Sequence, residues 1–141
     1  MKPLKSDIEE PMTESSRRYR TLAVDAAIFA AYACAVVGLA LSHEMWRDEV
    51  RALSIVQASG SLAELARNLR NEGHPSIWYL LLHAAYGLTH TPVILPVLSA
   101  AIAFAAALVF LRYAPFARPL KWMWLFGLYP LYEYSVMSRN Y

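Results

Sequence analysis

The sequence predicts an all-α, polytopic membrane protein with short amphipathic helices in its first outer loop. Of its 141 residues, 57% are hydrophobic and only 17% are charged, against roughly 25% in a typical soluble domain. The apolar residues form long blocks, and lysines and arginines gather near the ends of these blocks, as they do in membrane proteins. A net charge of +2 is too small to indicate a nucleic-acid partner.

Residues 1–20 are polar, contain two prolines and carry mixed charge, which predicts a flexible cytoplasmic tail ahead of a membrane part, 21–141. Arg17, Arg18 and Arg20 stand directly before the first apolar block. The positive-inside rule therefore predicts a cytoplasmic N-terminus. The apolar block is too long for the core of a cleaved signal peptide, so we expect it to remain as a membrane anchor.

The first membrane helix is expected over 21–42, because this length at about 1.5 Å per residue covers the roughly 30 Å hydrocarbon core of a bilayer. Asp25 lies inside it, one turn from the basic end. Our favoured interpretation pairs Asp25 with Arg18 or Arg20 near the lipid headgroups. The alternative is a proton or ion relay, because acids inside membrane helices are often functional.

Two short amphipathic helices are predicted between 43 and 73. Trp46, Val50 and Leu53 fall at helical spacing, and the segment Ser59-Gly60 then breaks the pattern. The sequence SLAE at 61–64 is a capping box, and leucines at positions 62, 65 and 69 continue it as one apolar stripe. We expect both helices to lie on the outer membrane surface.

The apolar run 76–88, SIWYLLLHAAYGL, covers about 20 Å as a helix and is short for a membrane span. Its tryptophan and tyrosines favour the membrane interface. A clear spanning helix is expected over 92–112, with Thr91 as its N-cap and Pro92 at its first position. The outer loop is therefore predicted to comprise residues 43–91.

Arg112, Arg118 and Lys121 follow this second span. They lie on the same side as the N-terminal arginines only if the short apolar run stays in the outer leaflet, which is the topology that the positive-inside rule favours. A further helix is predicted over 122–137, with a possible kink at Pro130. The sequence stops directly after it without a helix stop signal, so we expect the chain to be part of a longer protein.

The octapeptide HEMWRDEV at 43–50 places acids directly after the first span. If it is helical, Glu44 and Asp48 share a face. One interpretation is a salt-bridged helix start anchored by Trp46. The other is a carboxylate at the water–lipid boundary that accepts a proton from an acceptor substrate. His43 with these acids offers no convincing fourth ligand, so no metal site is predicted.

Several segments together resemble the GT-C superfamily of membrane glycosyltransferases. They are Asp48-Glu49 after the first span, EGHP at 72–75, WYLLL at 78–82, and YEY at 132–134 followed by SRNY at 138–141. The closest resemblance is to the bacterial branch similar to dolichyl-phosphate-mannose-protein mannosyltransferases. It covers about residue 20 onward, yet only the N-terminal part of such an enzyme, because members have many more membrane helices.

The resemblance implies transfer of a sugar from a polyprenyl-phosphate donor to an acceptor at the outer face of a bacterial inner membrane. Asp48 is the implied catalytic base, with Glu49 second. The implied substrate-binding residues are Glu72, His74, Arg139 and Tyr141, of which Arg139 contacts the donor phosphate.

Related branches carry a further acid where this chain has SRNY, so we expect neither a metal nor another cofactor. We expect this part of the enzyme alone to be inactive. Two alternatives remain open: a small non-catalytic helical membrane subunit, and a transporter fragment that uses Asp25 as its relay.

Overall fold

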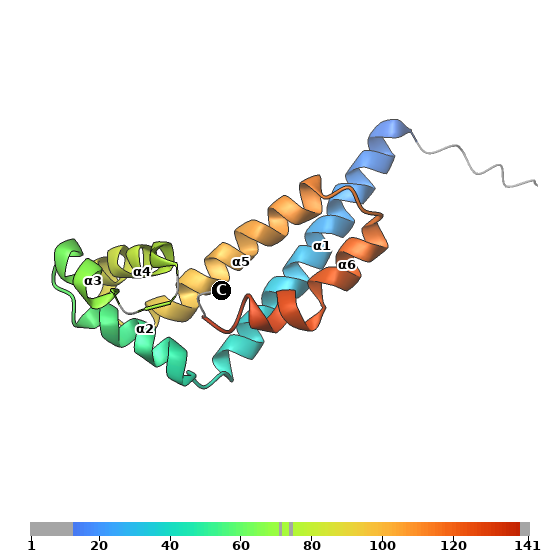
Figure 1. The fold of residues 1–141 in the computed structure, drawn as a ribbon. Helices are drawn as coiled ribbons and strands as arrows, with labels where there is room; N and C mark the ends of the chain where they lie inside the picture. The colour runs from blue at the N-terminus through green and yellow to red at the C-terminus, as the bar shows by residue number, and fades with distance from the viewer. Residues whose placement is uncertain (1–12, 71, 74, 139–141) are drawn as a thin grey trace, which may run out of the picture.

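The computed structural model describes residues 13–70, 72–73 and 75–138, and within these residues the protein is all-helical, as predicted (Figure 1). The elements are α1 (Glu14–Leu41), α2 (Arg47–Gln57), α3 (Leu62–Asn68), α4 (Ser76–Thr89), α5 (Ile94–Tyr113), α6 (Arg118–Leu125) and a π-helical turn, η1 (Tyr129–Glu133).

Two helices, α1 with 28 residues and α5 with 20, are long and apolar enough to cross a membrane. Only 11% of the most apolar window of α1 is buried within the described chain, and only 28% of that of α5. A core helix of a soluble domain would be mostly buried, whereas these helices present apolar side chains outward. Helix α1 begins earlier than the apolar block, at Glu14, where the Thr13 hydroxyl accepts a hydrogen bond from the Ser16 amide at 3.3 Å.

Helices α1 and α5 lie side by side and run in opposite directions (Figure 1). Ser99, Ala103 and Ala107 recur every four residues on α5 and are buried. Ala107 packs with Tyr32 and Val36 of α1 in one hydrophobic cluster. Small residues at this spacing let two apolar helices approach closely without a contribution from long side chains.

The three shorter helices α2, α3 and α4 gather beyond the end of α1 and around the start of α5 (Figure 1). A second hydrophobic cluster joins them, built from Ala52, Val56, Leu65, Trp78, Tyr79, Leu82 and Leu95. The two amphipathic helices predicted between 43 and 73 are therefore confirmed as helices. The capping of α3 differs in detail, because the Glu64 carboxylate accepts from the Gly60 amide at 2.8 Å while the Ser61 hydroxyl accepts from the Glu64 amide at 3.3 Å.

Helix α5 begins two residues later than the expected start at Pro92. Helix α4 ends at Thr89, and its C-cap residue His90 has a φ of 52°, in the left-handed region. A tight turn follows, in which the Ile94 amide donates to the Thr91 carbonyl and the Leu95 amide to the Pro92 carbonyl, both at 3.2 Å. These bonds join residues three apart, so the turn is tighter than an α-helix and delays its start.

The continuous helix predicted over 122–137 is wrong. Helix α6 begins earlier, at Arg118, and ends at Leu125. The Gly127 amide then turns back to the Trp124 carbonyl at 3.0 Å, and a single π-helical turn follows. Pro130 accounts for the break, because it has no amide hydrogen and its ring clashes with the carbonyl four residues earlier. The sequence pattern suggested a kink, whereas the structure has a full interruption.

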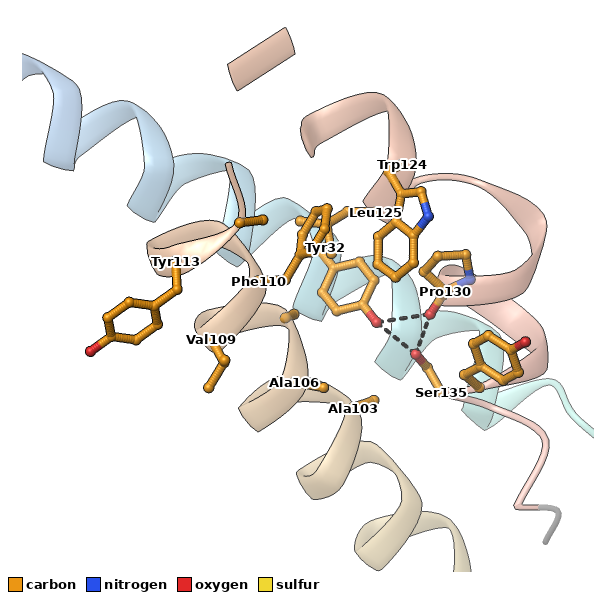
Figure 2. Close-up of a pocket in the computed structure, with 13 residues that line it drawn as sticks. Tyr32, Ala103, Ala106, Val109, Phe110, Tyr113, Trp124, Leu125, Pro130 and Ser135 are labelled. Atoms are coloured by element: carbon orange, nitrogen blue, oxygen red, sulfur yellow. Dashed lines mark hydrogen bonds between the residues drawn. The ribbon is translucent and has the colours of Figure 1, made fainter. Parts of the chain in front are cut away.

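The interruption leaves the carbonyl of Pro130 without a helical partner, and two side chains bind it instead (Figure 2). The Tyr32 hydroxyl of α1 donates to this oxygen at 2.9 Å, and the Ser135 hydroxyl also contacts it. The two hydroxyl oxygens lie 2.6 Å apart. Irregular backbone between apolar helices is stable only when such partners are supplied from within the protein.

Asp25 does not use the partners that the sequence suggested. Its carboxylate lies 3.6 Å from the Nε of Arg118, at the start of α6, rather than against Arg18 or Arg20. Arg118 also donates to the Thr21 hydroxyl at 3.1 Å. The basic residues that follow α5 therefore lie at the same end of the molecule as the arginines that open α1.

We expect Tyr32→Phe to lower the free energy of unfolding by about 1 to 2 kcal/mol, because it removes a hydroxyl that binds the buried Pro130 carbonyl. Thermal unfolding of the purified protein in detergent measures the effect. The matched control is Tyr19→Phe, since that side chain is 73% exposed and should change little. Equal midpoints for both variants would contradict the assigned role of Tyr32.

Candidate functional site

The carboxylate of Glu49 binds three separate segments of the chain. It is 1% exposed and occupies the third position of α2. One oxygen accepts from the Trp46 amide at 2.7 Å and from His43 Nε2 at 2.9 Å, and the other accepts from the Ser138 amide at 2.7 Å. Glu49 therefore joins the residues after α1, the start of α2 and the segment after η1.

Local sequence explains part of this arrangement. A glutamate at the third helical position can reach back to the amide of the N-cap residue, here Trp46, and so satisfies one of the unpaired donors at a helix start. The Ser138 amide lies 89 residues away from Glu49 in sequence, so no local sequence pattern predicts this contact. Burial of the carboxylate is possible because each of its oxygens has a donor.

His43 extends the Glu49 network to η1. Its Nδ1 lies 3.1 Å from the Tyr132 hydroxyl, and its side chain is 7% exposed. An ionised carboxylate can only accept, so Nε2 of His43 carries the hydrogen donated to Glu49. Nδ1 and the Tyr132 hydroxyl form a second hydrogen bond, whose donor is set by the protonation of the ring. A chain of hydrogen bonds therefore joins Tyr132, His43 and Glu49.

Asp48 and Glu49 are adjacent but differ in environment. Helix α2 begins at Arg47, so Glu44 lies before the helix and the shared helical face expected for Glu44 and Asp48 does not form. Successive residues on a helix point about 100° apart, and here Asp48 is exposed while Glu49 is buried. The first-turn position of Asp48 places its negative charge near the positive end of the helix dipole.

Glu72 is fixed beside α2 by Arg51. One oxygen of Glu72 accepts from Arg51 Nε at 2.8 Å and Nη2 at 2.5 Å, and the other accepts from the Tyr79 hydroxyl at 3.5 Å. The hydrogen bond and charge of Glu72 raise the pKa of Arg51 above its ordinary value, and Asp48 adds a weaker attraction. Asp48 and Glu72 therefore both act on the same guanidinium group.

The structure describes three of the six residues that the sequence proposed for the site. Asp48, Glu49 and Glu72 gather on and beside the first half of α2. His74, Arg139 and Tyr141 lie outside the described residues. The sequence pattern predicted no role for Tyr132, Ser138 or the His43–Glu49 contact. Only Glu49 has a local sequence signal, because a glutamate at the third helical position can cap the helix start.

An apolar cavity of about 530 Å³ lies between α1, α5, α6 and η1 (Figure 2). It follows α5 from Ala103 to Ala114, a length of about 16 Å at 1.5 Å per residue. Its other lining residues are Tyr32, Trp124, Leu125, Pro130, Tyr134 and Ser135. Ser135 stands three residues before Ser138, so the segment 135–138 connects this cavity to the Glu49 network.

Among the described residues, no group of three histidine, cysteine, aspartate or glutamate side chains is placed to hold a metal ion. No family model matches the chain, and no curated protein or solved structure matches it either.

We expect Glu49→Gln to destabilise the protein by about 2 to 3 kcal/mol, because an amide nitrogen would then face a buried donor. Asp48→Asn is the matched control: it removes the neighbouring charge from an exposed side chain and should cost no more than about 1 kcal/mol, the usual size of a charge–helix-dipole attraction. Thermal unfolding in detergent compares the two variants. Similar losses would show that the buried carboxylate is not the structural member of the pair.

Proposed function

We propose that this chain is the N-terminal membrane part of a glycosyltransferase that moves a sugar from a polyprenyl-phosphate donor to an acceptor at the outer face of a bacterial inner membrane. One observation carries the proposal. An exposed carboxylate, Asp48, sits on a helix start that Glu49 fixes in place, directly beyond the end of a helix long and apolar enough to cross a membrane.

Asp48 is the proposed general base. Its carboxylate takes the proton from a hydroxyl or amine of the acceptor while that atom attacks the anomeric carbon of the donor sugar. The bond between the anomeric carbon and the phosphate oxygen breaks, and polyprenyl phosphate leaves with the bonding electron pair. Attack from the face opposite the phosphate inverts the configuration at that carbon.

Glu49 is the proposed positioning residue for this base. Within the described residues its hydrogen bonds hold the backbone and His43, and its carboxylate is buried. A base works best when a rigid surrounding structure fixes its geometry. Arg51 and Glu72 support the same helix from its other side through their paired hydrogen bonds.

The apolar cavity supports a lipid-linked donor. Its lining is almost entirely hydrocarbon or aromatic, and its length along α5 suits several isoprene units. The segment 135–138 connects it to the Glu49 network, so a chain seated there would carry its phosphate toward the acidic residues. The proposed occupant is the polyprenyl tail of the donor.

The transporter alternative gains less support. Its central residue, Asp25, lies within ion-pair distance of Arg118 at the basic end of α1, which accounts for an acid in this apolar helix by anchoring alone. A non-catalytic subunit would share the same architecture, so only a sugar-transfer assay distinguishes it from the enzyme.

Asp48→Asn should lower sugar transfer at least a hundredfold without changing expression, because loss of a general base typically costs this much or more. The assay measures labelled sugar moved from a polyprenyl-phosphate donor in membranes that carry the full-length protein. The control is Glu44→Gln, an exposed acid outside the helix, which should transfer normally. Unchanged transfer in Asp48→Asn would remove this residue from the mechanism, and no transfer by the unaltered protein would favour the subunit.

Cysteine labelling tests the proposed orientation. In a Cys34→Ala background, Ala117→Cys at the start of α6 should react with an impermeant maleimide only from the cytoplasm, because the basic end is predicted to stay inside. Ala63→Cys, exposed on α3, should react only from outside. Labelling of both positions from one side would overturn the orientation.

A further inference from the structure

We infer that the end of the molecule opposite Asp48 holds a site for the phosphate headgroup of an anionic lipid. This inference rests on the membrane placement of α1 and α5 in the proposed function, but not on sugar transfer. Arg118 contacts Thr21 near the start of α1, whereas Glu49 contacts His43 after its end. These two levels of α1 are about 33 Å apart at 1.5 Å per residue, so the sites face opposite membrane surfaces.

The site is a cavity of about 730 Å³ between α1, α5 and α6. Its lining divides into two parts. The polar part holds four cations and one acid, namely Arg18, Arg112, Arg118, Lys121 and Asp25. The apolar part consists of Leu22, Ala26, Phe29, Leu108 and Leu111. The cavity therefore combines an excess of positive charge with a hydrocarbon wall.

Lys121 is the observation that most directly calls for an anion. Lys121 is 8% exposed, and its ammonium donates a hydrogen bond to the Leu111 carbonyl at 2.8 Å. No carboxylate within the described residues lies within ion-pair distance of it. A part-buried ammonium without a carboxylate partner is stabilised by a nearby anion, and this one lines the cavity.

Two arginines remain available for such an anion. Among the described residues that line the cavity Asp25 is the one acid, and it is already paired with Arg118. Within the described residues Arg18 forms no ion pair, and the guanidinium of Arg112 lies over the Tyr113 ring, 5.5 Å from its centroid. Arginine binds phosphate oxygens in a planar fork, and exposed arginines can swing inward to do so.

The apolar wall distinguishes a lipid from free phosphate. An inorganic anion would use the cations alone, whereas a phospholipid would also place its acyl chains against Leu22, Phe29 and Leu108. Basic pockets between membrane helices on the cytoplasmic side bind anionic headgroups for this reason. The proposed ligand is therefore a phosphate-bearing anionic phospholipid of the inner leaflet.

Native mass spectrometry of the whole chain in detergent tests the site, with equal amounts of phosphatidylglycerol and phosphatidylcholine added. We expect preferential retention of phosphatidylglycerol. The double variant Arg18→Gln with Arg112→Gln should weaken that retention about twenty-fivefold, since each basic residue contributes a factor of roughly five. The control Arg67→Gln with Arg70→Gln removes the same charge from the α3 region and should retain the lipid as the unaltered protein does.

Equal retention of the two lipids, or equal loss in both double variants, would overturn the site. Displacement of phosphatidylglycerol by millimolar inorganic phosphate would also overturn it, by assigning the pocket to a free anion. Carbonate extraction of membranes tests the shared premise separately, because a chain released by carbonate would refute the membrane placement itself. Loss of sugar transfer alone leaves the lipid result unaffected, so the two proposals fail independently.

Discussion

Burial of the Glu49 carboxylate is the constraint on which the rest of the site depends. A charged group at 1% exposure persists only if donors satisfy both oxygens, and here the donors come from His43, Trp46 and Ser138. Those residues belong to three segments that could otherwise move independently. The carboxylate thereby fixes the start of α2 against the end of the long helix α1. Because Asp48 belongs to that helix start, the same hydrogen bonds fix its position.

The interrupted segment after α6 supplies one of these donors. A regular helix over 122–137 would have no break at Pro130, and its amides would be occupied by intrahelical bonds. The break leaves the amide of Ser138 available to Glu49 and the carbonyl of Pro130 available to Tyr32. Both exchanges replace a local hydrogen bond by one that crosses to another segment, so the irregular backbone links α1 to the Glu49 network.

The sequence predicted the parts of this structure that depend on local pattern. Block length located α1 and α5, and helical spacing with capping residues located α2 and α3. The wrong helix over 122–137 arose because apolar composition outweighed the combined effect of Gly127 and Pro130. Contacts between distant segments were not predictable in this way: the partner of Asp25 is Arg118, and that of Glu49 is the Ser138 backbone.

The bond from Ser138 to Glu49 uses a main-chain amide, which every amino acid except proline provides. Its side chain is enclosed, with a hydroxyl that has no hydrogen-bond partner in the described part of the chain. The contact with Glu49 therefore requires a main-chain amide at this position, and the enclosed site requires a small side chain. Substitution of Ser138 by alanine or glycine would keep this hydrogen bond. Substitution by proline would remove it, because proline has no amide hydrogen.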